Sequence, residues 1–277
     1  MTTTIVAPAS AELSAITARI DELSAATEAA RTRTPDRWPT VLHKLKIRWT
    51  ADSNAIEGSS LNFADTLFFL EQGLTVAGKP LKDFLDARNH AEAIDLIYDV
   101  VHSQRPVSEG LLKELNALVL AGVSDLPTLD RHGRMGRRPA NPGAYKSQPN
   151  HVLLPDGSLH TYVDPLHVAG EMAALVAWIE GEPASTHPAV RAAMAHWHLV
   201  RIHPFEDGNG RLARLLMNLI LIRAQLLPAV IRNEDRAEYL AALRAGDRGD
   251  VDTFVSFALR AMERTLSGIG ADLSAGA

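Results

Sequence analysis

Apolar residues recur every three or four positions along most of the chain, which is the spacing of one face of an α-helix. The first such seam lies within a helix expected from Ser10 to Arg33 and comprises Leu13, Ile16, Ile20 and Leu23. The seam suits a helix packed on its own domain. A homodimer contact is the open alternative, because the seam is too short to specify a coiled coil by itself. Further helices are expected near residues 34–57, 62–71, 79–102, 108–120, 209–225, 234–246 and 250–268, and from near Pro165 and His187.

Residues that start or stop helices stand at the ends of these patterns. Ser108 is a good N-cap, and Gly58 and Gly73 follow apolar patterns as natural stops. Residues 122–142 are rich in Gly, Pro and Arg and are expected to form a loop. The one clear strand signal is "HVLLPDGSLHTYV", a short hairpin turning at Asp156 and Gly157. The pattern predicts a mostly α fold with one small β-hairpin.

Composition narrows the class of protein. The 277 residues are 46% hydrophobic, so one large domain or a domain with a helical annex is expected. A net charge of -5 disfavours a nucleic-acid partner. The absence of cysteine excludes disulfides, thiolate nucleophiles and cysteine-type zinc sites. No secretory signal and no run of about 18 apolar residues occurs, which predicts a cytoplasmic protein without a membrane partner.

One polar stretch, "RIHPFEDGNGRLAR" from Arg201, joins two apolar helices. Gly208 and Gly210 permit a tight turn, and the backbone N–H groups of a helix N-terminus favour an anion there. Asp207 beside that anion site would repel a phosphate unless a cation bridged them, and Mg²⁺ is the hard cation that does so. His203 at the rim is the residue suited to accept a proton near neutral pH.

The helix that follows is almost wholly apolar, yet Arg211, Arg214 and Asn218 share one of its faces. Arginines on a core helix need a partner or a ligand. His196 and His198 project to different sides of their helix, which favours structural roles over metal binding. The sequence contains no H-E-x-x-H, G-x-x-x-x-G-K-[ST] or G-x-S-x-G motif, which disfavours zincins, P-loop NTPases and α/β-hydrolases.

The stretch from His203 to Arg211, with Arg214 three residues on, matches the motif HPFx(D/E)GN(G/K)Rxx(R) and so resembles Fic proteins. The resemblance covers about residues 110–260. "SNAIEG", from Ser53 to Gly58, is similar to the family's inhibitory signature (S/T)xxxE(G/N), so the chain resembles the Fic (Fido) class with an upstream inhibitory helix. The implied organisation is a tail and helix (1–36), a helical region with the inhibitory motif (37–109), a catalytic domain (110–268) and a tail (269–277).

The resemblance implies transfer of AMP from ATP to a Ser, Thr or Tyr hydroxyl of a target protein, or of the chain itself. His203 would be the general base and Asp207 the Mg²⁺ ligand, with Arg211 and Arg214 near the β- and γ-phosphates. The implied nucleotide-binding residues are Glu206, Asp207, Gly208, Asn209, Gly210, Arg211, Arg214, Tyr239 and Leu240.

The same resemblance implies autoinhibition and a target-binding flap. Glu57 would pair with Arg214 in place of the γ-phosphate, and Ser53 would help to fix the helix. The hairpin between Lys146 and Tyr162 would align a target segment by strand addition.

The sequence departs from the pattern of Fic relatives at two positions. Leu240 stands where some relatives have an aromatic residue near adenine, and Asp247 stands where a relative has Asn, so the nucleobase preference is open. Alternative activities are removal of AMP with Glu57 orienting a water, Doc-type phosphate transfer, which usually has Lys in place of Gly210, and non-catalytic nucleotide binding. A basic loop comprises Arg131, Arg134, Arg137 and Arg138. Either it contacts the target protein or it is simply exposed to solvent.

Overall fold

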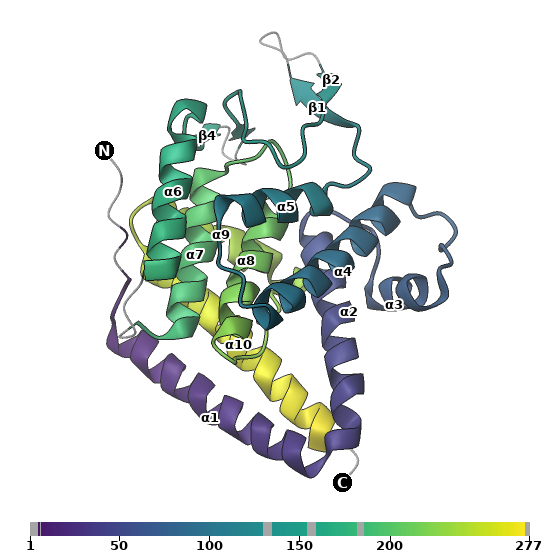
Figure 1. Ribbon diagram of the computed structural model, residues 1–277, viewed down its shortest axis with the longest axis vertical. Helices are drawn as coiled ribbons and strands as arrows, with labels where there is room; N and C mark the ends of the chain where they lie inside the picture. The colour runs from purple at the N-terminus through teal and green to yellow at the C-terminus, as the bar shows by residue number, and fades with distance from the viewer. Residues whose placement is uncertain (1–4, 6, 130–134, 154–158, 182–185, 275–277) are drawn as a thin grey trace.

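The computed structural model describes residue 5 and residues 7–129, 135–153, 159–181 and 186–274. Helices dominate the described residues, which confirms the mostly α fold class (Figure 1). The α-helices are α1 (Ala11–Arg33), α2 (Trp38–Ile56), α3 (Phe63–Gln72), α4 (Leu81–His102), α5 (Glu109–Val119), α6 (Pro165–Gly181), α7 (Pro188–Ile202), α8 (Asn209–Arg223), α9 (Arg236–Asp247) and α10 (Val251–Ser274).

The helix boundaries follow local chemistry that the sequence displays. The side chain of Ser10 caps α1 by accepting from the N–H of Leu13. Asn62 and Asp65 form a reciprocal capping box at the start of α3, which ends at the left-handed Gly73. Two ends differ from expectation. A short 3₁₀ turn, Pro35–Arg37, precedes α2, and α10 continues past residue 268 to Ser274.

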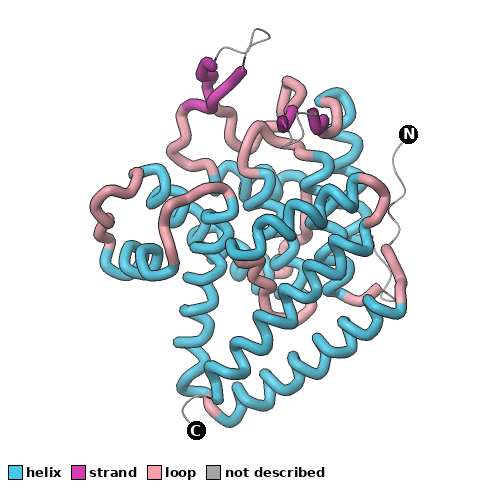
Figure 2. Tube along the Cα trace, turned by 180° about the vertical axis from the view of Figure 1, so that it is seen from behind, coloured by secondary structure: helices cyan, strands magenta, loops and turns pink. Residues whose placement is uncertain are grey.

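The strands correct part of the expectation. β3 (His151–Leu153) pairs antiparallel with β4 (Leu159–Thr161), which confirms the hairpin, although the turn expected at Asp156 and Gly157 lies outside the described residues. A second antiparallel pair, β1 (Asp125–Leu129) and β2 (Met135–Pro139), occupies the segment expected to be a loop. That expectation was wrong because the two segments pair through their backbones although their sequences lack the apolar alternation by which a strand is recognised. Figure 2 shows both strand pairs at one end of the molecule.

The core surrounds two successive helices, α7 and α8. α8 packs against α7, α4 and α5, and its residues Leu212, Leu215 and Leu219 are fully buried. Because α7 and α8 are joined by residues 203–208, the polar stretch of the sequence is fixed at both ends by the most deeply buried helices. The fold therefore holds this loop rigidly.

The first helix belongs to the same core. α1 lies along α10 (Figure 1), and Leu13, Ile16 and Ile20 are buried there while Leu23 is partly buried. The seam is thus covered by a helix of its own chain, as expected for a helix packed on its own domain. In the part of the chain that the structure describes, no helix combines the length and apolarity needed to cross a bilayer.

Truncation of Ile20, whose side chain is fully buried, tests whether α1 is part of this core. Ile20→Ala is expected to lower the free energy of unfolding by about 2–5 kcal/mol, because it removes buried methylenes and leaves a cavity. Urea unfolding measures the change. The exposed Glu22→Ala in the same helix should cost no more than about 0.5 kcal/mol. Equal stability of the two variants would mean that α1 does not pack as described.

Candidate active site

His203 follows α7 directly and has an unusual backbone conformation. Its φ is 50°, the left-handed region, which costs a non-glycine residue of order 1–3 kcal/mol. The ring Nδ1 lies 3.3 Å from the carbonyl oxygen of Val200. Nδ1–H donates to that oxygen, so Nε2 keeps a free lone pair. The imidazole is therefore held in a tautomer that can accept a proton at Nε2.

Tyr162, just after β4, covers one face of this imidazole. The two rings are stacked with centroids 3.7 Å apart and an interplanar angle of 16°. Burial lowers the pKa of His203 to about 3, helped by the nearby ammonium of Lys146 and opposed by the hydrogen bond to Val200 and the charge of Glu57. His203 is consequently neutral at physiological pH, as a general base must be.

The loop after His203 is closed by Asn209. The Asn209 side chain accepts from the backbone N–H of Phe205 at 3.0 Å and donates to the carbonyl of the same residue at 2.9 Å. These two bonds fix the loop from inside. Among the described residues, no side chain caps the start of α8, whose N-cap residue is Gly208. The N–H groups of the first turn of α8 therefore remain for an anion.

A second clamp comes from α5. Asn116 is fully buried, donates to the carbonyl of Asp207 at 2.9 Å and accepts from the N–H of Gly143 at 2.9 Å. Gly208 adopts a φ of +77°, and a Cβ there would lie 3.1 Å from the Asn116 amide nitrogen. Close approach of Asn116 and positive φ together explain the glycine. Asn116 thus ties the loop to the segment that leads to the hairpin.

Asp207 presents a carboxylate at the edge of this anion site. Its Oδ1 accepts from the N–H of Gly208 at 2.7 Å, while Oδ2 lies 4.0 Å from Arg211 and the side chain is 47% exposed. One available carboxylate beside an anion site fits Mg²⁺, which commonly binds one or two carboxylates together with substrate phosphates. Among the described residues, no cluster of three or more acidic or histidine side chains could hold a metal without such help.

Arg214 connects the loop to the segment from Ser53 to Gly58. It is 2% exposed and extends from α8 to the end of α2. Its guanidinium donates to the side chain of Ser53 at 2.9 Å, to the Ser53 carbonyl at 2.9 Å and to Glu57 at 2.7 Å. The hydroxyl of Tyr239 lies 3.4 Å away on the other side. The two sequence segments that the family resemblance singled out therefore meet directly.

Glu57 lies at the start of α8 as well as beside Arg214. A Cβ at Gly210 would overlap the Glu57 carboxylate, so glycine there allows the carboxylate to approach the helix. Burial alone would raise the pKa of Glu57, but the charge and hydrogen bond of Arg214 bring it below its usual value. Glu57 is therefore ionised at neutral pH and occupies an anion position with its charge.

Arg211 is the second arginine of α8 and is 4% exposed. It pairs with Asp86 of α4 at 2.9 Å, and Lys82 contacts the other oxygen of that carboxylate at 2.5 Å. A buried guanidinium in apolar surroundings needs such a partner. Asp86 leaves one guanidinium nitrogen of Arg211 directed toward Asp207. Both arginines that the sequence marked are thus located at the same loop.

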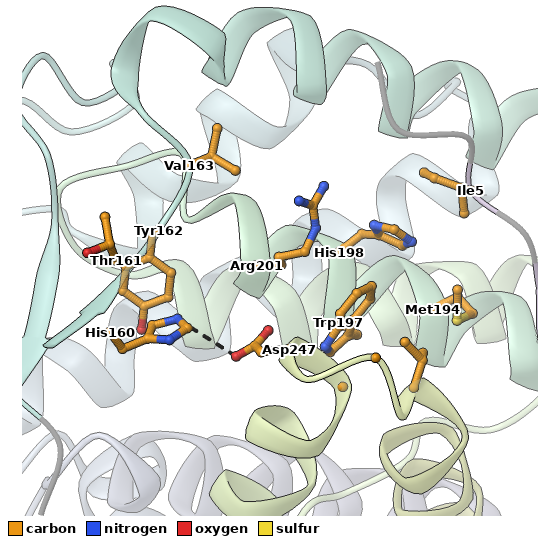
Figure 3. Close-up of a pocket in the computed structure, with 13 residues that line it drawn as sticks. Ile5, His160, Thr161, Tyr162, Val163, Met194, Trp197, His198, Arg201 and Asp247 are labelled. Carbon is orange, nitrogen blue, oxygen red and sulfur yellow. Dashed lines mark ion pairs between the residues drawn. The ribbon is translucent and has the colours of Figure 1, made fainter. Parts of the chain in front are cut away.

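A pocket of about 650 Å³ is lined in part by Tyr162, the residue whose ring stacks on His203. Figure 3 shows His160 and Asp247 next to one another in its lining, and their ion-pair atoms are 3.7 Å apart. Trp197 of α7 lines the same wall and leaves its indole N–H without a partner among the described residues. Burial raises the pKa of Asp247, against the positive charges of His160 and Arg201.

Three residues of the expected nucleotide set point elsewhere. Glu206 pairs with Arg138 of β2 at 2.5 Å. Tyr239 is 2% exposed and lies behind Arg214, with its hydroxyl 3.1 Å from His196. Leu240 is partly buried against the core. Tyr239 therefore reaches the site through Arg214 and not as an exposed ring.

The other polar residues marked in the sequence are accounted for in part. His196 is fully buried and stacks on Phe254, and His198 is buried beside Trp197, so both have structural surroundings. In the basic loop, Arg137 donates to the carbonyl of Asp125. Arg131 and Arg134 lie outside the described residues.

Sequence reasoning missed four residues of the site: Asp86, Asn116, Lys146 and Tyr162. None belongs to a motif with a known spacing. Asn116 had the clearest available signal, since it lies one turn from Leu112 on an otherwise apolar face of α5. A polar residue within an apolar stripe indicates a buried hydrogen-bonding role.

The chain is similar to known proteins in sequence. The model of the Fic/DOC family matches residues 106–221. A relative named protein adenylyltransferase Fic, from Nematostella vectensis, is 33% identical over 215 residues, which are 77% of this chain and 46% of that protein. Protein adenylyltransferase fic-1 of Caenorhabditis elegans is 33% identical over 219 residues, covering 76% and 39%. The chain thus matches less than half the length of these curated relatives.

Solved structures agree on the fold. A Fic domain containing signaling protein from Bacteroides thetaiotaomicron VPI-5482 superposes with a TM-score of 0.82 at 28% identity, over 94% of this chain and 98% of that one. Fic-1 of Caenorhabditis elegans gives a TM-score of 0.74 at 26% identity, over 96% and 73%. Both similarities extend well beyond residues 106–221.

Asn116→Ala tests the clamp on the Asp207 loop. The variant leaves the Asp207 carbonyl and the Gly143 N–H without their partner, at about 1–3 kcal/mol for each buried group. Asn150→Ala is the matched control, because the Phe205 carbonyl that Asn150 contacts also accepts from Asn209. Urea unfolding should show the larger loss for Asn116→Ala. A larger loss for Asn150→Ala would contradict the assigned contacts.

Proposed function

Residues 106–221 form a Fic/DOC family domain, and on that premise we propose that the chain transfers AMP from ATP to a hydroxyl group of a protein. The relatives named protein adenylyltransferase support this activity at the level of the family. One observation carries the proposal: a neutral His203, an uncapped helix start, an exposed Asp207 carboxylate and two buried arginines converge on one loop. This arrangement suits phosphate binding next to a base.

Each residue then has a defined role. Nε2 of His203 takes the proton of the acceptor hydroxyl as its oxygen attacks the α-phosphorus, and pyrophosphate leaves. The first N–H groups of α8, with Arg211 and Arg214, bind the phosphates and stabilise the charge that develops on them. When bound at Asp207, Mg²⁺ neutralises charge on the same phosphates. Catalysis here depends on positioning and electrostatics.

We assign the nucleoside of ATP to the pocket beside Tyr162. That pocket is lined by Tyr162, whose ring stacks on His203, and it has the volume of a small-molecule site. Asp247 supplies a hydrogen-bonding carboxylate along its wall. Under this assignment Asp247 contributes to nucleobase choice, and Tyr239 acts indirectly by supporting Arg214.

We propose that the chain is autoinhibited by Glu57. Its carboxylate and the γ-phosphate would compete for the same guanidinium of Arg214, because the oxygens of either group can accept hydrogen bonds from the guanidinium N–H groups. With Glu57 in place, ATP would bind with its phosphates turned from in-line attack. Removal of AMP, with Glu57 orienting a water, is the second candidate, because the carboxylate lies at the phosphate site. Doc-type transfer is disfavoured, because position 210 carries Gly and not the Lys that is usual in that branch.

Labelled ATP distinguishes these activities. Label retained by protein from the α-phosphate indicates AMP transfer, and label retained from the γ-phosphate indicates phosphorylation. His203→Ala in a Glu57→Gly background should retain neither, because loss of a general base costs about 10²–10⁴-fold. Retention of only the γ-label would refute AMP transfer.

Glu57→Gly is expected to raise AMP incorporation by on the order of 10²-fold, because it frees Arg214 for the γ-phosphate and restores alignment for attack. Glu57→Gln keeps the shape without the charge and should give an intermediate gain. The double variant Glu57→Gly with Arg214→Ala should lose the gain. Equal incorporation by the unmutated chain and Glu57→Gly would remove autoinhibition from the account.

Asp207→Ala is expected to abolish the dependence of nucleotide affinity on magnesium, because the ion loses its carboxylate. Isothermal titration with ATP in Mg²⁺ and in EDTA measures this dependence without requiring turnover. Asp65→Ala, at the capping box of α3, is a control carboxylate away from the loop. An unchanged response to Mg²⁺ in Asp207→Ala would place the metal elsewhere.

A further inference from the structure

Lys146 is a buried cation that the roles described above leave unexplained. It is 3% exposed, yet no carboxylate pairs with it in the described part of the chain. Its ammonium has one long contact, 3.5 Å to the carbonyl of Ile202, and lies 5.8 Å from the ring centroid of Tyr162. A buried lysine is rarely left so poorly paired, so its location calls for a reason.

Lys146 contacts the backbone carbonyls of the residues before and after His203. Its backbone N–H donates to the carbonyl of Pro204 at 2.8 Å, and its ammonium contacts the carbonyl of Ile202. The neighbouring Tyr145 forms an isolated antiparallel β-bridge with Phe205. His203 lies between these contacts in a left-handed conformation that the local sequence would not adopt unaided.

We propose that Lys146 is a positioning residue for His203, which holds the left-handed turn from both sides and keeps a positive charge beside the imidazole. The proposal rests on the proposed function, in which His203 is the base. The backbone contact fixes the turn, and the ammonium adds a side-chain contact while opposing a second positive charge on the ring. The stacked Tyr162, which lies against both residues, completes the enclosure.

The charged groups around Lys146 and His203 favour a charged Lys146 beside a neutral His203. Burial lowers the pKa of Lys146 to about 8, with Asp164 opposing the shift. At neutral pH the ammonium is therefore still mostly charged. Lys146 and His160 act to lower the pKa of His203, while Glu57 of α2 acts to raise it. Removal of the lysine charge should raise the pKa of His203, because one of the two repelling cations is lost.

The test compares Lys146→Met, which keeps the stem and loses the charge, with Lys146→Arg, which keeps the charge. The exposed Lys44→Met, remote from the loop, is the control. NMR of protein labelled at its histidine rings, with His203 assigned from a His203→Gln spectrum, follows the ring over pH without nucleotide. In Lys146→Met the protonation of His203 should begin at higher pH than in the unmutated protein. In Lys146→Arg and Lys44→Met it should not move.

A measurement on the unmutated chain covers the case in which Lys146→Met does not fold. The His203 ring signals should show an inflection near pH 8, where Lys146 loses its proton. In the Glu57→Gly background, Lys146→Met should also lower kcat by about tenfold or more with unchanged nucleotide affinity, because the base is misplaced. Its acidic limb of kcat/KM should move to higher pH.

The outcomes separate the two proposals. Absence of AMP transfer with a shifted His203 titration would refute the proposed function and leave the Lys146–His203 coupling intact. An unshifted His203 titration in folded Lys146→Met, or the absence of the inflection near pH 8 in the unmutated chain, would overturn the role of Lys146.

Discussion

The burial of two arginines on a core helix is the constraint from which the site follows. Arg211 and Arg214 are each almost fully enclosed on α8, and a buried charge that loses its partner costs about 3–5 kcal/mol. Asp86 of α4 satisfies one guanidinium, and Ser53 and Glu57 of α2 satisfy the other. α2 and α4 are thereby joined to α8 by charge as well as by apolar packing. A ligand that takes Arg214 from Glu57 must replace those bonds, which makes a phosphate its natural competitor.

The loop between α7 and α8 shows how a flexible composition becomes a rigid site. Its glycines would make the segment mobile in isolation. Asn209 closes it from inside, Asn116 holds it from α5, and Lys146 holds the residues on either side of His203. The side-chain amides of Asn116 and Asn209 hydrogen-bond to backbone groups within and beside the loop. The N–H groups at the start of α8 remain for a ligand. The proposed function therefore depends on these supporting side chains as well as on the groups assigned to the phosphates.

His203 has a strained backbone conformation, while its surroundings favour the neutral form of its ring. The left-handed turn directs the ring back toward Val200, whose carbonyl sets the tautomer. Burial under Tyr162 and the charge of Lys146 keep the ring neutral. The strain is tolerated because buried helices hold both ends of the loop, and the result is an imidazole whose proton affinity is set by its surroundings.

The sequence alone determined most of the helices, the cap at Ser108 and the nine-residue motif with its upstream partner, because periodicity, capping and local spacing are properties of neighbouring residues. It did not predict the β1–β2 ribbon, which lacks an apolar alternation. The tertiary structure alone decided that Tyr239 lies behind Arg214, that Glu206 pairs with Arg138, and that Asp86, Asn116 and Lys146 support the site. These contacts join residues far apart in the chain, and they form only where packed helices bring a particular donor and acceptor together in a place from which water is excluded.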